Sequence, residues 1–333
     1  MSNQEGEEVR SSFNRSSVTN QTKDDALTCD HVYRSAYLFF VTVHSLVFLV
    51  GLPLNGFIVK FYFCRAQQKA SSSITVYLKN LAAADFLLCL CLPIRIAKYA
   101  SNSPTVHSIN CNFATAMLFL NIYASIMFMG YIAANRYLKV VRPLGTHILQ
   151  TVRAAHIIST ATWVFLLAVT NAFIILSFHG QRSSTSVPVR CEGSSNGQFS
   201  SLYKMTHTCS TIMFLSVLVS LVFFYYSTAR QVSLAQQRQP ASSSSTKLAK
   251  SRRNMLVLVS VFCFCFVPYH LVLLPKAFRW SCSWSTFLHY ATEVTIVMSV
   301  LNVCLDPIIY FILSKKFRTQ IRLFGSRVTV HNT

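Results

Sequence analysis

Charged residues are scarce in this chain. Only 12% of its 333 residues are charged, and ten acids stand against thirty Lys and Arg residues, which leaves a formal charge of +20. A soluble domain has about a quarter of its residues charged. Because 52% of the residues are hydrophobic, the sequence excludes an ordinary soluble domain and indicates a protein that presents much of its surface to lipid.

Several chemical signatures are also missing. The sequence has no His-Glu-x-x-His helix, no Gly-x-Ser-x-Gly turn and no pair of aspartates in a protease-like context, so we expect neither enzymatic activity nor a catalytic residue. No cluster of His and Cys has the spacing of a metal site, and no motif predicts a cofactor. The basic residues form short clusters between apolar runs rather than one exposed face, which argues against nucleic acid as a partner.

Seven apolar runs are each long enough to cross about 30 Å of hydrocarbon as a helix. They occupy residues 36–63, 74–99, 111–137, 154–178, 202–229, 253–279 and 286–312. We therefore predict an all-α membrane protein, a bundle of seven transmembrane helices with membrane lipids as constant partners. The serine-rich segment 236–251 predicts a mobile loop between the fifth and sixth spans.

The distribution of charge predicts the orientation of the bundle. Lys and Arg gather in one set of alternate connections that contains no acid, whereas six of the ten acids precede the first span. Because basic residues are retained on the cytoplasmic side during insertion, we expect a plasma-membrane protein with its N-terminus outside and its C-terminus inside. Two Asn-x-Ser/Thr sequons then predict glycosylation at Asn14 and Asn20.

Four of the eleven cysteines fall on the side predicted to be extracellular, which is oxidising. They are Cys29, Cys111, Cys191 and Cys282. We expect two disulfide bridges among them, and four cysteines allow three pairings. The other seven lie within or at the ends of apolar runs, where a thiol packs as a small hydrophobic group.

Polar side chains inside the spans are expensive to keep in hydrocarbon. Asp85 and Asp306 are the clearest cases, with Asn55, Asn121 and Asn302 as candidate partners. These groups either form a functional network or only hold neighbouring helices together through hydrogen bonds. Both interpretations remain open at this point.

Arg136 lies where the third span ends. A single Arg at that place is either a membrane anchor or part of a signalling surface. Pro93, Pro268 and Pro307 lie inside three spans, where the missing backbone donor allows a kink. Kinked helices that end beside basic connections favour the signalling interpretation.

An ordered set of motifs accompanies these residues. The motifs are Asn55-Gly56, Leu81 to Asp85, Cys111, Asn135-Arg136-Tyr137, Trp163, Cys191, Phe262 to Pro268 and Asp306 to Tyr310. Over residues 30–320 the chain thereby resembles rhodopsin-like (class A) G-protein-coupled receptors. Three finer stretches, Tyr77 to Asn80, Arg136 to Pro143 and Cys265 to His270, resemble the purinergic branch with the ADP and UDP-glucose receptors. The stretch Asn302 to Tyr310 also resembles the platelet-activating factor receptor.

The resemblance implies a division of the chain. Residues 1–35 would be a glycosylated extracellular segment, residues 36–313 the transmembrane domain, and residues 314–333 a short amphipathic helix and tail in the cytoplasm. It also implies bridges between Cys111 and Cys191 and between Cys29 and Cys282. Asp85 would belong to an activation network that often binds sodium. The network residues are Asn55, Asp85, Asn302 and Asp306.

The resemblance further implies coupling to a heterotrimeric G protein, of the inhibitory class by analogy with the purinergic branch. The residues assigned to coupling are Asn135, Arg136, Tyr137, Tyr226 and Tyr310. Arg136 and the two tyrosines Tyr226 and Tyr310 would rearrange to admit a helix of the G-protein α-subunit. Asn135 departs from the family pattern, because an acid usually precedes the arginine.

The ligand is an extracellular small molecule by the same resemblance. The pocket residues assigned by motif position are Arg95, Phe119, Tyr123, Tyr269, His270, Leu273, Lys276, Thr292 and Glu293. Leu273 and Thr292 stand where the nucleotide branch has Arg and Lys, and polyphosphates are held by such paired cations. Arg95, Lys98 and Lys276 either supply replacement charge or anchor the protein at the interface.

A lipid mediator or lysophospholipid with one anionic head is therefore favoured over a nucleotide, and a purinergic receptor is the alternative. A transporter or channel is the alternative from another class. It would need repeated halves or a polar path through the bundle, and the sequence shows neither. No Lys lies in residues 286–312, which excludes a retinal Schiff base in the last span.

Overall fold

A computed structural model describes residues 36–64, 72–101, 103–141, 147–182, 197–238, 243–278, 285–314 and 316–322. Seven helices in these ranges are long and apolar enough to cross a membrane. The first begins at residue 36 and ends in a π-helical turn, Lys60–Cys64. The next is α2, Ser73–Ala100. The third span joins α3, Pro104–Ile109, through the π-helical turn Asn110–Ala114 to α4, Thr115–Val141.

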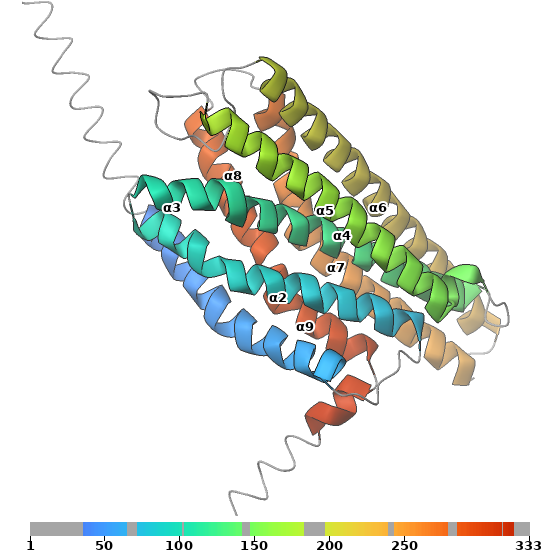
Figure 1. The fold of residues 1–333 in the computed structure, drawn as a ribbon. Coiled ribbons are helices and arrows are strands. Elements are labelled where there is room, and N and C mark those ends of the chain that lie inside the picture. The colour runs from blue at the N-terminus through green and yellow to red at the C-terminus, as the bar shows by residue number, and fades with distance from the viewer. Residues whose placement is uncertain are drawn as a thin grey trace, which may run out of the picture.

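The remaining four spans complete the bundle shown in Figure 1. They are α5, Val152–Arg182; α6, Gly197–Arg238; α7, Ser243–Phe278; and the pair α8, Ser285–Val300, with α9, Asn302–Leu313. A 3-10 turn, Ile148–Gln150, precedes α5. No strand occurs in the described ranges. The predicted fold class, an all-α bundle of seven transmembrane helices, is confirmed.

Several helices are longer than the apolar runs predicted. The third begins at Pro104 rather than at residue 111, and proline suits that first-turn position because no helical donor is needed there. The predicted loop at 236–251 is wrong at both ends, because α6 continues to Arg238 and α7 already begins at Ser243. Hydropathy marks where lipid contact stops. At the end of α6 the residues Gln236, Gln237 and Arg238 continue the helix because their intrinsic helix propensity is high.

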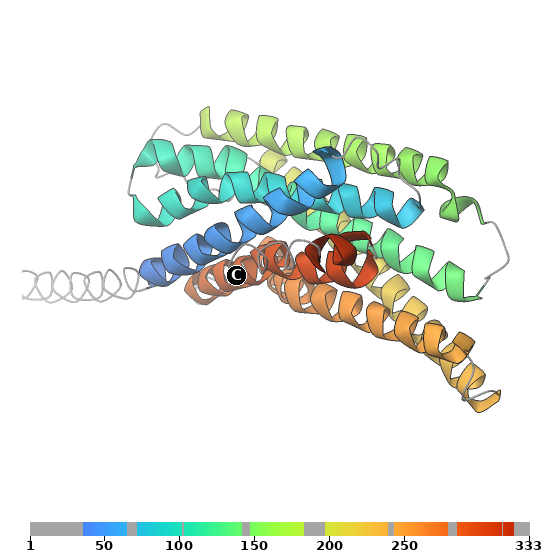
Figure 2. The ribbon, with the colours of Figure 1, turned by 90° about the horizontal axis from the view of Figure 1, so that it is seen from below.

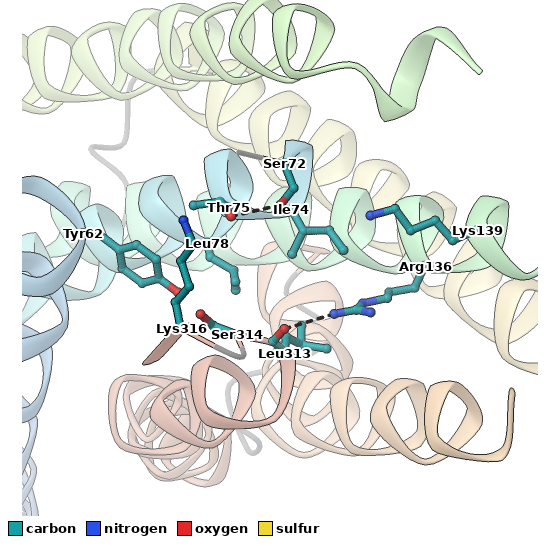
Figure 3. A pocket seen from close by; sticks show the side chains of 10 residues that line it. All are labelled: Tyr62, Ser72, Ile74, Thr75, Leu78, Arg136, Lys139, Leu313, Ser314 and Lys316. Atoms are coloured by element: carbon teal, nitrogen blue, oxygen red, sulfur yellow. Dashed lines mark hydrogen bonds between the residues drawn. The ribbon is translucent and has the colours of Figure 1, made fainter. Parts of the chain in front are cut away.

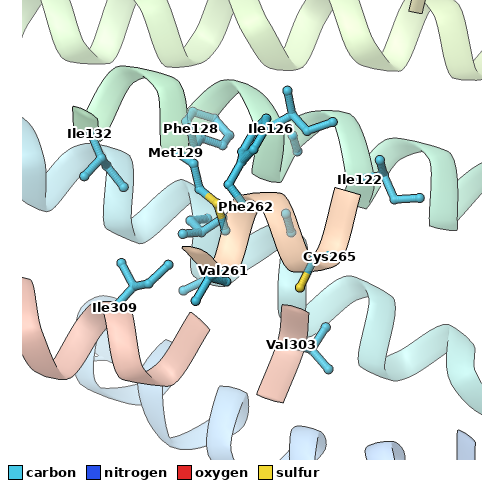
Figure 4. Close-up of a cluster of buried hydrophobic side chains, with 14 of the residues drawn as sticks. Ile122, Ile126, Phe128, Met129, Ile132, Val261, Phe262, Cys265, Val303 and Ile309 are labelled. Atoms are coloured by element: carbon cyan, nitrogen blue, oxygen red, sulfur yellow. The ribbon is translucent and has the colours of Figure 1, made fainter. Parts of the chain in front are cut away.

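The core lies around α4, which contacts α2, α5, α6 and α7. Its buried face carries Ile122, Ile126 and Met129, which pack in one cluster with side chains of α7 and α9 (Figure 4). Phe262 and Cys265 supply the α7 side of this cluster, and both side chains are fully buried. The spacing of three and four residues along α4 places these side chains on one face.

The outer surface of the bundle is apolar as well. Large hydrophobic side chains such as Leu46, Val219 and Leu271 are more than half exposed. In water such a surface would be unstable, but lipid solvates it. The exposed apolar residues therefore mark the faces that contact the membrane.

A short helix, residues 316–322, follows α9 beside the end of the first helix (Figure 2). Its buried Phe317 ring lies 5.3 Å from the Phe61 ring and 6.0 Å from the Phe57 ring, measured between centroids. Lys316 and Arg322 are exposed. The predicted C-terminal helix is thus present.

The two ends of the bundle are distinguished by their buried cations. Arg95 lies near the last residue of α2 and defines the Arg95 end. Arg136 lies near the last residue of α4 and defines the Arg136 end. Because Asn135 of α4 bonds to Ser73 at the start of α2, the two helices run antiparallel and these ends are opposite.

Candidate functional site

A polar network crosses the middle of the bundle. The Asp85 carboxylate accepts the Asn121 amide at 3.3 Å and the Tyr310 hydroxyl at 3.0 Å. Asn302 donates to the side-chain oxygens of Asn121, at 3.3 Å, and Ser125, at 3.1 Å. These five side chains are buried and come from α2, α4 and α9. The structure therefore joins the predicted network residues Asp85 and Asn302 to Tyr310, which the resemblance assigns to coupling.

Asn55 lies beside this network but is not bonded to Asp85. Its amide nitrogen donates to the Gly51 oxygen at 3.0 Å and to the Val303 oxygen at 2.7 Å. A Cβ at Gly51 would lie 3.0 Å from the Val303 side chain, so the first helix and α9 approach closely because position 51 has no side chain. Asn55 thus links the first helix to the backbone of α9 by a hydrogen bond.

Asp306 is fully buried next to Asp85. Neither of its carboxylate oxygens accepts a hydrogen bond from a donor among the described residues. Two neighbouring carboxyl groups that are fully buried need a proton or a cation between them, because like charges repel strongly at low dielectric. The pair is therefore a candidate cation or proton site.

A second polar cluster lies at the Arg95 end, between α2 and α8. Glu293 accepts Lys98 Nζ at 2.6 Å, and Arg95 Nη2 lies 3.7 Å from its other carboxylate oxygen. The Tyr99 hydroxyl donates to that same oxygen. The Arg95 side chain is only 2% exposed. An interfacial anchor must reach the headgroups, so this interpretation of Arg95 is excluded by its burial.

The first helix closes one side of this charged cluster. The Phe40 ring stacks on Tyr99 with centroids 5.3 Å apart, and the His44 ring lies 5.4 Å from Tyr99. His44 Nδ1 is 2.8 Å from the Phe40 oxygen. These contacts hold the ring of Tyr99 so that its hydroxyl points at Glu293.

An aromatic cluster lies deeper at the same end, between α4, α6 and α7. His270 Nδ1 lies 2.8 Å from the Phe266 oxygen, which can only accept, so this nitrogen carries the proton. Nε2 then accepts the Tyr123 hydroxyl at 3.2 Å. Phe214 stacks on the imidazole with centroids 3.8 Å apart, and Phe119 lies 4.4 Å from Tyr123. The imidazole is therefore a fixed member of this buried aromatic cluster.

Three other predicted pocket residues have simpler surroundings. Tyr269 packs edge-on against His270, with centroids 5.2 Å apart. Leu273 is buried, and the Thr292 hydroxyl donates to the Leu288 oxygen of its own helix at 2.6 Å. Lys276 lies in α7, but its side chain is outside the described part of the chain.

The predicted coupling residues lie at the Arg136 end and are only partly brought together. Arg136 Nη2 donates to the Leu313 oxygen at 3.2 Å. Asn135 donates to Ser73 Oγ at 2.7 Å. The Tyr137 ring stacks on Phe224 with centroids 4.9 Å apart. Tyr226 is 67% exposed on the outer face of α6 and does not reach Arg136.

The cysteines and sequons fall mostly outside the described residues. Cys111 is buried and disulfide-bonded. Cys29, Cys191, Cys282, Asn14 and Asn20 lie outside the described residues, so the predicted pairings and glycosylation remain predictions.

This geometry agrees with the comparisons with known proteins. Residues 54–310 match the family described as 7 transmembrane receptor (rhodopsin family). The chain belongs to this family. It is 31% identical to purinoceptor 14 of Bos taurus over 282 residues, which cover 83% of this chain and 82% of that protein. It is 31% identical to G-protein coupled receptor 87 of Mus musculus over 287 residues, 84% of this chain and 78% of that protein.

A third relative is Probable G-protein coupled receptor 34 of Mus musculus, 28% identical over 288 residues, which cover 83% of this chain and 74% of that protein. The predicted resemblance to the purinergic branch is thereby confirmed. The receptor is a multi-pass plasma-membrane protein that couples to a G protein and takes an extracellular small-molecule ligand. It is not an enzyme, because receptors of this family signal through a change of shape.

Sequence reasoning missed several partners within the receptor. Tyr99 could have been found, because it follows Arg95 by four residues and therefore lies on the same face of α2. Phe214, which stacks on His270, and Ser73, which bonds to Asn135, have no signal in the sequence. Both lie far along the chain from their partners, and only the packing of helices brings them together.

Proposed function

We propose that the receptor is activated by a lipid mediator with one anionic head, of the lysophospholipid class, and signals through a heterotrimeric G protein of the inhibitory class. In this proposal the Arg95 end faces the outside of the cell and the Arg136 end faces the cytoplasm. The single observation that carries the proposal is the charge of the cluster formed by Arg95, Lys98 and Glu293. Two cations and one anion leave one positive charge.

The free donors of Arg95 support an anionic ligand. Its Nε and Nη2 atoms donate no hydrogen bond to an acceptor in the described ranges, although the side chain is buried. A buried donor without an acceptor costs about 1–3 kcal/mol. A carboxylate or phosphodiester oxygen would satisfy these donors and balance the charge.

The aromatic cluster deeper at the Arg95 end suits an acyl or alkyl tail. Phe119, Tyr123, Phe214 and His270 form a continuous aromatic surface in which the polar atoms of Tyr123 and His270 already bond to each other. Leu273 and Thr292 add no charge to this surface. Apolar and aromatic walls with few polar groups are typical of small-molecule sites.

A nucleotide is the second candidate, because one of the relatives, from Bos taurus, is a purinoceptor. A polyphosphate needs several cations with paired contacts. In this receptor Glu293 already accepts Lys98 and faces Arg95. The remaining charge suits one anionic group better than two or three.

Signal transmission would use the network in the middle of the bundle. Tyr310 bonds to Asp85 across the bundle, and Arg136 bonds to the last carbonyl of α9. We assign to the pocket at Asp85 and Asp306 a sodium ion or a proton in the resting state, and to Asn135, Arg136, Tyr137, Tyr226 and Tyr310 the response to the G protein. Bridges from Cys111 to Cys191 and from Cys29 to Cys282 complete the proposed outer face.

A screen in transfected cells tests this proposal. G-protein activation is measured for lysophospholipids, ether phospholipids, hydroxy fatty acids, ADP and UDP-glucose on a panel of Gα subunits. We expect an anionic lipid to activate an inhibitory Gα, and Arg95→Gln to weaken its potency at least 10-fold at matched surface levels. Lys79→Gln is the matched control, because Lys79 is also in α2 but lies over the Phe63 ring, away from Glu293.

Submicromolar activation by ADP or UDP-glucose, with no response to the lipids, would overturn the lipid assignment. In that case Leu273→Arg with Thr292→Lys should not improve the nucleotide response. If the lipid proposal holds, the same double variant should turn a weak nucleotide response into a stronger one, because it restores two phosphate-binding cations.

A further inference from the structure

A cavity lies at the Arg136 end, between α2, α4, the end of α9 and the helix 316–322. Its volume is about 180 Å³. Arg136 and Lys139 extend into it from α4, and Lys316 extends from the short helix (Figure 3). Tyr62, Ser72 and Thr75 add hydroxyl groups to its wall. The cavity is therefore a basic site with neutral donors between the cations.

No carboxylate side chain balances these three cations. The ion pairs within the described residues both involve Glu293, at the opposite end of the bundle. The ten acids of the whole sequence are at positions 5, 7, 8, 24, 25, 30, 85, 192, 293 and 306. None of these positions lies in the connections at the Arg136 end, so the segments outside the described residues cannot supply an acid there either.

Of the three cations, Arg136 is held in place by a hydrogen bond. Arg136 is tied to the Leu313 oxygen at 3.2 Å, and its Nε donates no hydrogen bond to a described acceptor. The backbone at Lys316 is anchored because the next residue, Phe317, is buried against Phe57 and Phe61, whereas the Lys316 and Lys139 side chains are solvent-exposed at the mouth of the cavity. Ser72 Oγ and Thr75 Oγ1 lie 3.0 Å apart, and each hydroxyl can rotate to donate into the cavity.

We propose that this cavity binds a phosphorylated polyol, either the headgroup of a phosphoinositide lipid or the corresponding free inositol phosphate. Phosphate oxygens accept several charge-assisted hydrogen bonds at once, which three cations and three hydroxyls can donate. A single water needs about 10–15 Å³ of such cavity space, so the cavity has room for many water-sized groups and exceeds what a single small anion fills. Basic pockets between helices at the cytoplasmic face of a membrane bind such headgroups.

The bound phosphate would be the counter-anion of Arg136. The residue beside Arg136 is the neutral Asn135, which bonds to Ser73, so the chain itself supplies no negative charge to the arginine. The site can be tested by itself, and only its consequence for signalling depends on the proposed coupling role of Arg136.

Binding is measured by calorimetry on the purified full chain in nanodiscs of phosphatidylcholine. The probes are dioctanoyl phosphatidylinositol 4,5-bisphosphate and inositol 1,4,5-trisphosphate. We expect saturable binding of at least one probe. Tighter binding of the lipid identifies the membrane as the source of the ligand, and equal binding identifies the free headgroup.

Paired variants separate the cavity from general electrostatic attraction. Lys139→Gln with Lys316→Gln should weaken the Kd at least 10-fold. Arg230→Gln with Arg322→Gln removes the same charge from positions at this end that do not line the cavity and should change the Kd less than 2-fold. Lys139→Arg with Lys316→Arg keeps the charge and should retain binding.

Three results would overturn the proposal. The first is the absence of saturable binding by both probes. The second is an equal loss of affinity in the Lys139/Lys316 and Arg230/Arg322 variants. The third is a loss of affinity in the Lys→Arg double variant as large as in the Lys→Gln double variant. Because neither the outer ligand nor a G protein takes part in the measurement, failure of this site is distinguishable from failure of the proposed function.

Discussion

Asn55 donates its side-chain amide to the backbone oxygen of Val303 at 2.7 Å, and this carbonyl is the one that Pro307 leaves without a helical donor. In an α-helix the nitrogen of residue 307 would bond to the oxygen of residue 303, and proline has no hydrogen to donate. Asn55 in the first helix therefore donates the hydrogen bond that the Val303 oxygen does not receive within α9. The polar residue in one span and the proline in another form one structural unit.

Replacing this amide should lower stability measurably. Asn55→Ala leaves the Val303 oxygen without its donor, and interhelical hydrogen bonds in membranes are worth about 0.6–2 kcal/mol. Because 1 kcal/mol shifts the midpoint of a large domain by about 2–4 °C, a loss of that size lowers the unfolding midpoint by about 1–8 °C. The measurement is the thermal unfolding of purified receptor in detergent. The control is Asn171→Ala, because exposed Asn171 bonds only within its own helix, to the Leu167 oxygen; equal shifts in the two variants would contradict this assignment.

Much of the fold could be predicted from the sequence, since span number and helix type follow from apolar runs that must satisfy their own backbone groups in lipid. Asp85, Asn302 and Asp306 could be predicted as site residues because polar groups in hydrocarbon are energetically costly. What could not be predicted is pairing across helices. Glu293 stands without the lysine that usually precedes it in the nucleotide branch, but its partners Lys98 and Arg95 are far away in the chain.

The ends of the helices could not be predicted from the sequence either. Hydropathy locates where α6 and α7 leave the lipid, but the polar residues beyond remain helical, so the predicted loop is wrong. The motif places Tyr226 beside Arg136, and the structure exposes it on α6. The motif gives a position along a helix, whereas the direction of a side chain depends on the packing of its neighbours.

Replacing Glu293 and replacing Arg95 should change the potency of an anionic ligand in opposite directions. Glu293→Gln removes the internal anion that balances Lys98 and Arg95, so the two cations become available to the ligand. We expect the potency of the anionic lipid to rise about 10-fold in this variant, which corresponds to about 1.4 kcal/mol. Arg95→Gln should lower it. Concentration–response curves for G-protein activation at matched surface levels check both signs, and a fall in potency in both variants would show that Glu293 only positions the cations.

The disulfide at Cys111 should be essential for the outer face. We expect replacement of Cys111 or Cys191 by Ser to abolish surface expression or the ligand response, because a bridge that closes a long loop typically contributes about 2–4 kcal/mol. Replacement of Cys29 or Cys282 should do less harm. Surface labelling measures the first effect. Mass spectrometry of non-reduced peptides identifies the pairing, and any partner of Cys111 other than Cys191 would refute the assigned framework.

Asn135 should leave the receptor with measurable signalling in the absence of ligand. A carboxylate beside Arg136 would hold the arginine by charge, and a partly buried pair can bias a two-state equilibrium by a few kcal/mol, roughly 10-fold or more in population. Asn135 instead donates to Ser73 at 2.7 Å, and Arg136 is held by the neutral oxygen of Leu313. We therefore expect Asn135→Asp to reduce basal G-protein activation and Arg136→Ala to eliminate it. All variants are compared in the same cells at equal surface levels, with Gln237→Glu as the control for an added negative charge at an exposed position near the end of α6. A basal signal that is unchanged or raised by Asn135→Asp would show that the contact with Ser73, rather than the missing charge, sets the resting state.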